Sequence, residues 1–421
     1  MIEIKPSGKI DAVFDAPPSK AHTLRALFIS SLASGKTTLA RPLLADDQLV
    51  AMNALKEFGV VFQPKGESLD VLGTGGELSL PKKEVFVGNS GVTARFLLSF
   101  AALCPPGEIT VDGDPRMRER PVGDLAEALS LLGVKIKFLE KKGFFPLTVS
   151  GKTLGGGRTS INAEISSQYF SSILISAPYA ESDVSIGAVG AMRSRPYVDI
   201  TVQMMRDFGV KAKNSAYKDF FVNAGQRYKG RKFDIEGDYS NSAYFFAAAA
   251  VTGGKVLVRN LPKGSAQGDK KFLDFLGEMG CGVKEKGNEV SVEGKGLRGI
   301  TADLSDYPDI AQPLAVVAAF AKGRTVIRNV GHLRFKECDR LNATAVELKK
   351  IGAKAAVNGD DLVIDGGRAL HGADIETYSD HRMAMSFAVA GLAVKGIGIL
   401  GEDCVKKSFP DFFAELRKVY S

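Results

Sequence analysis

A repeated plan constrains the fold of this chain more than any other feature: six apolar helical segments, each opening with polar residues, recur along its length. They read SKAHTLRALFISSLASGKTTL, GNSGVTARFLLSFAALCPPGEITV, ISSQYFSSILISAPYAESDVSI, YSNSAYFFAAAAVTGGKVLV, YPDIAQPLAVVAAFAKGRTVI and YSDHRMAMSFAVAGLAVKGIGIL. Each shows a capping-type start, an apolar helix, a short break that usually contains glycine, and a β-branched strand. Because they are apolar on most faces, the helices are predicted to be buried.

Amphipathic segments alternate with the buried ones. They read DDQLVAMNALKEFGV, RPVGDLAEALSLLGV, RPYVDITVQMMRDFGV, QGDKKFLDFLGEMGCGV and ECDRLNATAVELKKIGA, with FPDFFAELRKVY as a truncated sixth. The first five stop at glycines suited to a left-handed helix cap, namely Gly59, Gly133, Gly209, Gly280 and Gly352. The chain is therefore predicted to hold six βαβαβ-type units of roughly seventy residues, arranged as two pseudo-symmetric α/β domains of three units each. The boundary is expected near residues 229–240.

The composition favours a soluble protein that binds small anions. Apolar residues make up 45% and charged residues 24% of the 421, and the net charge is +7. The basic residues are scattered without a polybasic run, so small anionic substrates fit better than a nucleic acid or a membrane. Neither a secretory signal nor a membrane span is apparent, and a cytoplasmic location is expected. The four cysteines match no metal-site spacing and are interpreted as thiols.

Basic residues stand at or beside the predicted helix starts, where the helix dipole disfavours cations. They are Lys20, Arg25, Arg95, Arg120, Arg195, Lys336, Arg340, Arg382 and Lys407. Singly, each would be interpreted as a surface charge, and the polar residues beside them as caps. Together they indicate anion sites, because unpaired N–H groups and cations both attract negative charge. The helix starts are expected to converge on one cleft between the domains.

Two carboxylates interrupt this cationic pattern. Asp309 lies at the start of the fifth buried helix, and Glu337 lies between Lys336 and Arg340. Alone, Asp309 would be interpreted as a helix cap. In a cationic cleft, such a carboxylate can serve as a general acid or base. Asp339 is expected to be a structural partner of a nearby arginine.

With these residues assembled, the chain resembles the 5-enolpyruvylshikimate-3-phosphate (EPSP) synthases of the enolpyruvyl transferase family over essentially its full length. The resemblance is carried by PSKAHTLRAL, GNSGVTARF, DGDPRMRERPVGDL, ISSQYFSSIL, RSRPYVDIT, GDYSNSAYF, YPDIAQPLA, RFKECDRL, YSDHRMAM and KSFPDFF. It implies two inside-out α/β domains, residues 18–235 and residues 1–17 plus 236–421, with the active site between them. It also implies a monomer that uses no metal or organic cofactor.

The resemblance implies transfer of the enolpyruvyl group of phosphoenolpyruvate to the 5-hydroxyl of shikimate 3-phosphate, with release of phosphate. The residues implied for phosphoenolpyruvate are Lys20, Asn89, Gly91, Arg120, Gln168, Arg340, Arg382 and Lys407. Those implied for shikimate 3-phosphate are Lys20, Arg25, Ser166, Ser167, Gln168, Ser194, Tyr197, Asp309 and Lys336. For the chemistry, Asp309 is expected to act as base and Glu337 as proton donor to the methylene carbon, assisted by Lys20 and His381.

The chain departs from the family pattern at its first two motifs. Pro18 and Ala21 stand where the family usually has Gly and Ser, so a hydroxyl expected to contact the shikimate carboxylate is missing. Arg25 remains, and we expect weaker binding of that group or compensation by a neighbour, either His22 or Thr23. The residue after Gly91 is valine, which predicts altered glyphosate sensitivity in a direction left open. His332 stands near a position where some members have Asn, and its role is also left open.

Three alternatives are weighed against this interpretation. UDP-N-acetylglucosamine enolpyruvyl transferase shares the fold and the donor, but it carries a reactive cysteine where this chain has Pro115. RNA 3′-phosphate cyclases use similar modules, but they need a nucleotide-accepting histidine and a broad basic face. A non-catalytic anion-binding relative would follow if Ala21 had disabled the site, which the presence of Lys20, Asp309 and Glu337 argues against.

Overall fold

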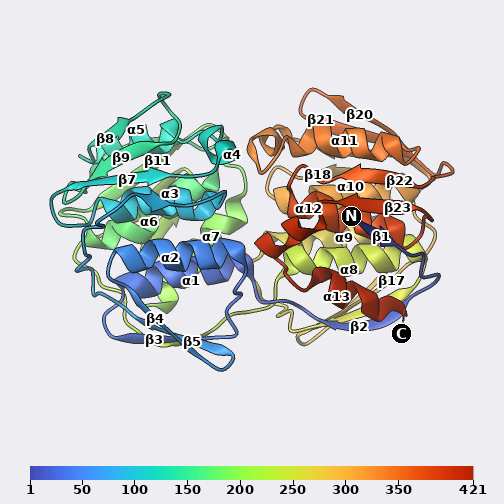
Figure 1. Ribbon diagram of the computed structural model, residues 1–421, viewed down its shortest axis with the longest axis horizontal. Helices are drawn as coiled ribbons and strands as arrows, with labels where there is room; N and C mark the ends of the chain where they lie inside the picture. The colour runs from blue at the N-terminus through green and yellow to red at the C-terminus, as the bar shows by residue number, and fades with distance from the viewer. Residues whose placement is uncertain (421) are drawn as a thin grey trace. The chain divides into compact units, whose positions relative to one another are not determined.

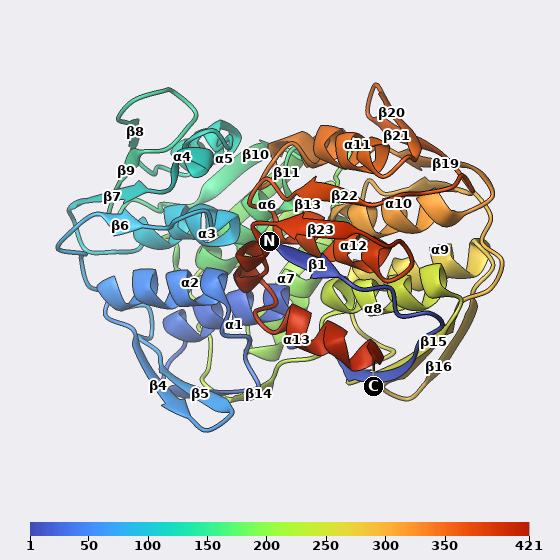
Figure 2. The ribbon, with the colours of Figure 1, turned by 45° about the vertical axis from the view of Figure 1, so that its right-hand side comes forward.

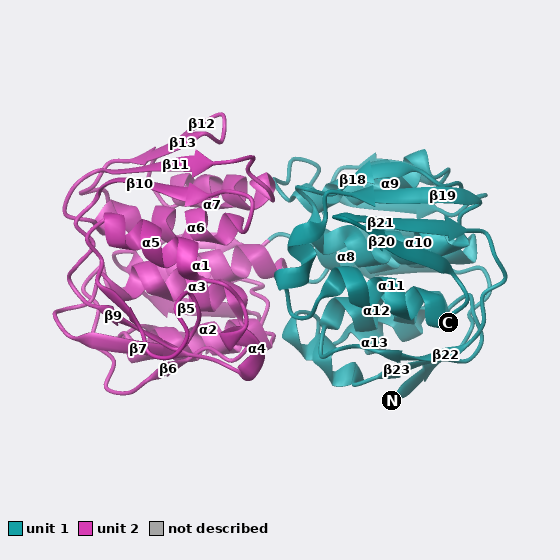
Figure 3. Cartoon of the chain, turned by 90° about the horizontal axis from the view of Figure 1, so that it is seen from above, with its two compact units in different colours: residues 1–17, 236–421 teal, residues 18–235 magenta. Residues whose placement is uncertain are grey.

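The computed structural model describes residues 1–420. The contacts divide the chain into two compact units, coloured separately in Figure 3. Unit 1 comprises Met1–Pro17 together with the chain from Glu236 onward, and unit 2 comprises Pro18–Ile235. Each unit is described by itself.

Unit 2 contains three repeats, each with a buried helix, an amphipathic helix and a four-stranded sheet (Figure 1). Its helices are α1 (Lys20–Leu32), α2 (Asp46–Glu57), α3 (Gly91–Ala101), α4 (Pro115–Arg118), α5 (Gly123–Leu131), α6 (Ser167–Ser176) and α7 (Arg195–Asp207). Its strands are β3 (Lys36–Ala40), β4 (Val61–Lys65), β5 (Ser68–Leu72), β6 (Val85–Phe86), β7 (Glu108–Asp112), β8 (Ile136–Phe138), β9 (Leu147–Ser150), β10 (Gly157–Asn162), β11 (Val184–Val189), β12 (Ala212–Ser215), β13 (Asp219–Val222) and β14 (Lys232–Asp234).

Unit 1 repeats the plan, with two four-stranded sheets and one three-stranded sheet. Its helices are α8 (Tyr239–Thr252), α9 (Lys271–Glu278), α10 (Ala311–Phe320), α11 (Arg340–Lys350), α12 (His381–Gly391) and α13 (Phe412–Leu416). Short 3₁₀ helices relevant to the site are η2 (Gly268–Lys270), η3 (Pro308–Ile310), η4 (Gly331–Phe335) and η5 (Glu402–Lys407). Its strands are β1 (Ile2–Ile4), β2 (Asp11–Asp15), β15 (Lys255–Arg259), β16 (Gly282–Lys286), β17 (Glu289–Glu293), β18 (Thr301–Asp303), β19 (Gly323–Arg328), β20 (Lys354–Asn358), β21 (Asp361–Gly366), β22 (Ala373–Glu376) and β23 (Ile397–Leu400).

Strands from distant parts of the sequence complete the first sheet of unit 2 and the first and last sheets of unit 1. In unit 2, β14 pairs in parallel with β3. In unit 1, β2 pairs in parallel with β15, and β1 pairs antiparallel with β23 (Figure 2). The N-terminal segment therefore belongs to the same compact unit as the C-terminal half of the chain.

Local sequence explains where the helices begin and end. The side chains of Ser19, Ser166 and Asp238 accept hydrogen bonds from backbone N–H groups in the first turns of α1, α6 and α8. Almost every residue of α8, α10 and α12 is buried, as expected for helices that are apolar on most faces. The five glycines that follow the amphipathic helices all have positive φ, between 90° and 110°.

The structure confirms the six-unit plan and the buried helices. It corrects the composition of the repeat, which is βαβαββ in the five complete units, because a hairpin such as β4–β5 follows each amphipathic helix. The sixth unit lacks this hairpin, and β1 supplies the third strand of its sheet. No helix among residues 1–420 is long and apolar enough to cross a membrane.

Candidate active site

The predicted site residues fall into two groups, one in each unit. In unit 2, the first of them is Lys20, the first residue of α1. Its Nζ lies 2.6 Å from Oδ2 of Asp47, which is at the start of α2 and is 5% exposed. Because a buried carboxylate fixes the lysine, its ammonium group is held at the N-terminal end of a helix, where a cation would otherwise be disfavoured.

The start of α3 forms a cationic cradle, which we define as Asn89, Gly91, Arg95, Arg120 and Gln168. Arg120 Nη1 donates to Asn89 Oδ1 at 3.1 Å, and Arg95 Nη1 donates to Gln168 Oε1 at 3.2 Å. A Cβ on Gly91 would lie 2.5 Å from Arg120 Nη2 and 2.6 Å from Arg95 Nη1. Glycine is therefore required for both guanidinium groups to approach the backbone here, which explains the residue physically.

Arg25 is buried and bonded on every nitrogen. Its Nε donates to Thr201 Oγ1 at 2.7 Å, while Nη1 and Nη2 donate to the carbonyl oxygens of Ala21 and Tyr197 at 3.0 and 2.9 Å. Burial lowers its pKa to about 10. These bonds tie α1 to α7, so Arg25 has a structural function in addition to the substrate contact that the resemblance implies.

The serines and tyrosine expected at the acceptor phosphate lie at the starts of α6 and α7. Ser166 caps α6, accepting from Gln168 N at 3.3 Å, and Ser167 is the buried first residue of that helix. Ser194 precedes α7 with a left-handed backbone, at φ 56° and ψ 38°. Tyr197 lies in the first turn of α7. These positions present hydroxyl groups beside helix N-termini, an arrangement that suits a phosphate.

In unit 1, Arg340 is the centre of an ion cluster. It is 2% exposed, and three carboxylates surround its guanidinium group. Its Nε lies 2.7 Å from Asp380 Oδ2, its Nη2 lies 2.8 Å from Glu337 Oε2, and its Nη1 lies 3.2 Å from Asp309 Oδ1. Although burial alone would lower the pKa of Arg340, these three carboxylates raise it above its ordinary value.

Arg382 shares Asp309 with Arg340. Its Nη2 lies 2.8 Å from Asp309 Oδ2, and its Nη1 donates to the Asp309 carbonyl oxygen at 3.1 Å and to the Tyr244 hydroxyl at 3.3 Å. Asp309 therefore bridges two buried guanidinium groups while remaining 22% exposed. Burial raises the pKa of Tyr244 to about 12, so this hydroxyl stays neutral. His381 Nδ1 lies 3.7 Å from Asp380 Oδ1.

The remaining predicted residues of unit 1 lie on 3₁₀ helices or their ends. Lys336 follows η4, and His332 is buried within it. Lys407 was expected beside a helix start, but it is the last residue of η5 and precedes α13 by several residues. The expectation for Asp339 is also wrong: its carboxylate caps α11 by accepting from Asn342 N at 3.1 Å. Arg340 pairs instead with Asp380, Glu337 and Asp309.

Four residues that order these groups were missed by sequence reasoning: Asp47, Thr201, Tyr244 and Asp380. Asp380 could have been found, since it directly precedes the two cations at the start of α12 and accepts from Arg382 N at 2.9 Å. The others lie on neighbouring helices, and only the packing of α1 against α2 and α7, or of α8 against α12, brings them to their partners.

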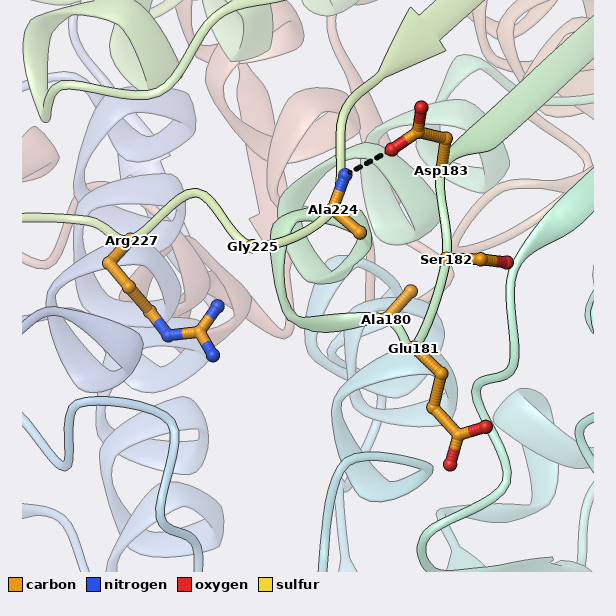
Figure 4. Close-up of a pocket in the computed structure, with 7 residues that line it drawn as sticks. All are labelled: Ala180, Glu181, Ser182, Asp183, Ala224, Gly225 and Arg227. Carbon is orange, nitrogen blue, oxygen red and sulfur yellow. Dashed lines mark hydrogen bonds between the residues drawn. The ribbon is translucent and has the colours of Figure 1, made fainter.

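A pocket of about 650 Å³ lies elsewhere in unit 2, lined by Ala180, Glu181, Ser182, Asp183, Ala224, Gly225 and Arg227 (Figure 4). None of the predicted site residues lines it. Asp183 accepts a hydrogen bond from Ala224 N at 2.9 Å in one wall of the pocket, so the Asp183 carboxylate already has a backbone partner. Within residues 1–420, no group of three or more His, Cys, Asp or Glu side chains could hold a metal ion.

Comparisons with known proteins identify the family of this chain. A sequence model of the family EPSP synthase (3-phosphoshikimate 1-carboxyvinyltransferase) matches residues 4–416. A 3-phosphoshikimate 1-carboxyvinyltransferase of Methanoculleus marisnigri is 44% identical over 99% of this chain and 98% of its own length. A 3-phosphoshikimate 1-carboxyvinyltransferase of Trichormus variabilis is 41% identical over 97% of this chain and 96% of its own length.

The fold is also similar to that of a solved protein. The structure of EPSP synthase from Acinetobacter baumannii matches with a TM-score of 0.83 at 27% identity, covering 99% of this chain and 97% of that one. The match of both sequence and fold over nearly the whole length confirms the two-domain inside-out α/β class. This chain belongs to the EPSP synthase family, the 3-phosphoshikimate 1-carboxyvinyltransferases.

Proposed function

We propose that this protein transfers the enolpyruvyl group of phosphoenolpyruvate to the 5-hydroxyl of shikimate 3-phosphate, a step of aromatic amino-acid biosynthesis. The products are phosphate and 5-enolpyruvylshikimate 3-phosphate. The observation that carries the proposal is the ion cluster of unit 1, in which Asp309 bridges Arg340 and Arg382. It places a carboxylate that can accept a proton beside two cations that can hold an anionic substrate.

The addition step of the reaction needs two proton transfers. The 5-hydroxyl loses a proton as its oxygen attacks C2 of phosphoenolpyruvate, and the methylene carbon C3 gains one. We assign Asp309 as the base for the hydroxyl and Glu337 as the donor to C3, with Lys20 and His381 assisting. Breakdown of the tetrahedral intermediate then breaks the bond from C2 to the phosphate oxygen and re-forms the double bond, with loss of a proton from C3.

In this proposal, the basic residues of both units bind the anionic groups of phosphoenolpyruvate. Arg340, Arg382 and Lys407 in unit 1, and Lys20 with the cationic cradle in unit 2, hold the carboxylate and phosphate of phosphoenolpyruvate. Fixed positive charges stabilise the developing negative charge of the transition state and then the leaving phosphate. The two groups act on the same pair of substrates in one reaction.

The acceptor is assigned to the hydroxyl-bearing helix starts. Ser166, Ser167, Ser194 and Tyr197 bind its phosphate, Arg25 contacts its carboxylate, and Gln168 contacts both substrates. Lys336 and Asp309 contact the ring hydroxyls. Ala21 removes one hydroxyl, and His22 does not replace it as a cation, because burial and then the charge of Arg25 lower the pKa of His22 to about 3. We propose a monomer in the cytoplasm.

Substitution of the two acid–base residues tests the assignment. Asp309→Asn and Glu337→Gln keep the shape of each side chain but remove its charge, and we expect kcat for phosphate release to fall by about 10² to 10⁴. Asp403→Asn is the matched control, since Asp403 is 79% exposed and pairs only locally, with Lys406. Retention of full activity by Asp309→Asn in a folded protein would rule out its assignment as base.

A further inference from the structure

Unit 1 contains a fully buried carboxylate, Glu347 of α11, that the proposed mechanism does not use. Its Oε1 accepts a hydrogen bond from the Tyr378 hydroxyl at 2.8 Å, and its Oε2 accepts one from Glu376 N at 3.1 Å. Lys350 approaches the same Oε2 to 2.9 Å from an exposed position on α11. Both carboxylate oxygens therefore have partners, and two of the three partners belong to the segment that leads into α12.

This segment forms a tight turn with an unfavourable backbone. Asp380 N donates to the Thr377 carbonyl oxygen at 2.8 Å, which closes a turn of four residues. The two central residues, Tyr378 and Ser379, have φ values of 53° and 54°. Positive φ at both central positions is characteristic of type I′ turns, which favour glycine, asparagine and aspartate. A tyrosine and a serine keep this conformation only where the surrounding structure fixes it.

Side-chain contacts hold the turn from two neighbouring elements. Thr377 Oγ1 donates to the carbonyl oxygen of Leu400, the last residue of β23, at 2.7 Å. From α11, Glu347 binds the hydroxyl of Tyr378, one of the two residues with positive φ. α11 also packs against β22, the strand that precedes the turn. Glu347 is thus a buried anchor for the unfavourable part of the turn.

The turn ends at the residue that orders the ion cluster. Asp380 Oδ2 lies 2.7 Å from Arg340 Nε, and Asp380 Oδ1 accepts from Arg382 N at 2.9 Å. A shift of the turn would therefore move a carboxylate that orients one arginine and begins the helix that carries the other. Arg340 and Glu347 lie two helical turns apart on α11, and hence on the same face of that helix. One helix supplies both the arginine and the anchor of its carboxylate partner.

We propose that Glu347 is a positioning residue for the phosphoenolpyruvate site. Its bond to Tyr378 holds the turn, and the turn holds Asp380 against Arg340. The inference rests on the proposed function, because that proposal assigns Arg340 and Arg382 to the anionic donor substrate. Small displacements of a group that holds the substrate weaken its binding. A purely structural Glu347 would affect stability and leave substrate binding unchanged.

Tyr378→Phe tests the inference, because it deletes one hydroxyl from an exposed ring and leaves Glu376 N and Lys350 as partners of Glu347. We expect KM for phosphoenolpyruvate to rise about five- to tenfold while kcat changes less than about twofold, as expected for a loss of substrate binding. Lys350→Gln is the matched control: it removes the exposed partner of Glu347 without touching the turn, and its KM should equal that of wild type. A wild-type KM in Tyr378→Phe would overturn the inference.

A second measurement needs no turnover and separates this inference from the proposed function. Arg340 Nε donates to Asp380 in a buried position, so its proton should exchange slowly with water in nuclear magnetic resonance spectra. The signal is assigned by its absence in Arg340→Lys. We expect its exchange rate to rise at least about tenfold in Tyr378→Phe and to stay unchanged in Lys350→Gln.

The two measurements have distinguishable failures. If the protein turns over neither acceptor but the exchange rate rises in Tyr378→Phe, the proposed function fails and the positioning of Arg340 through the turn stands. An unchanged exchange rate in Tyr378→Phe would overturn the inference whatever the activity.

Discussion

At the residue scale, His22 shows how burial fixes the charge of a side chain beside the predicted acceptor site. It is 5% exposed, its Nδ1 lies 3.0 Å from Ser19 Oγ, and burial followed by the charge of Arg25 lowers its pKa to about 3. In the unfolded chain this imidazole protonates near pH 6.5, whereas in the folded protein it stays neutral. Its contribution to stability is therefore complete above pH 6.5 and is lost as pH falls toward 3.

His22→Asn should reduce this acid sensitivity, because the amide does not titrate. Between pH 6.5 and pH 5, we expect wild type to lose about 2 kcal/mol of unfolding free energy that the variant retains. Urea denaturation at both pH values measures the difference. His371→Asn, at an exposed position, should lose as much as wild type. An equal loss in His22→Asn and wild type would contradict the buried neutral state.

Val92 gives a second prediction about a single residue. It directly follows Gly91 of the cationic cradle and is half-buried in the first turn of α3. We expect the glyphosate concentration for half-inhibition to differ between wild type and Val92→Thr by at least about threefold, because a hydroxyl replaces a methyl group on the residue that follows Gly91. The direction is left open. Superimposable dose–response curves would remove the basis for altered sensitivity.

At the scale of the element, the start of α3 depends on the close approach of two guanidinium groups to Gly91. Gly91→Ala would place a Cβ within 2.6 Å of both Arg95 and Arg120, so at least one must shift. We expect KM for phosphoenolpyruvate to rise about tenfold while the protein remains folded. Gly277→Ala on α9 is the control: nothing lies within 4 Å of its added Cβ, and its KM should be unchanged.

The start of α12 makes a second prediction at this scale. Asp380 both caps this helix and pairs with Arg340, and it is fully buried. Asp380→Ala leaves a buried guanidinium group without one of its carboxylates, and we expect a loss of about 3–5 kcal/mol in unfolding free energy. Asp339→Ala removes a solvent-accessible cap of α11 and should cost about 1 kcal/mol. Equal losses in urea denaturation would show that Asp380 is only a cap.

At the scale of the whole molecule, the repeat and its buried helices were predictable from the sequence. Helical periodicity and terminal glycines are local signals that recur in the amphipathic segments, and capping residues are local signals that precede several of the buried helices. The hairpin after each amphipathic helix was not recognised, because short exposed strands such as Val61–Lys65 carry few apolar residues. The pairing of β2 with β15 depends on contacts across most of the sequence.

The composition of the site was predictable only in part. Residue types at helix starts indicated anion binding, and the structure brings Asp309, Arg340 and Arg382 together as one cluster. Partners such as Asp47 and Tyr244 come from neighbouring helices and carry no local signal. The catalytic and substrate-binding roles of the individual residues stay predictions, which the substitutions above test.

Acceptor specificity distinguishes an enzyme that acts on shikimate 3-phosphate from its relatives. Phosphate release by the purified protein should be measured with phosphoenolpyruvate and either shikimate 3-phosphate or UDP-N-acetylglucosamine. We expect release only with shikimate 3-phosphate, lowered by about 10² to 10⁴ in Glu337→Gln and in Asp309→Ala, which would also show that Ala21 is tolerated. Release with neither acceptor from a folded protein, or with UDP-N-acetylglucosamine instead, would contradict it.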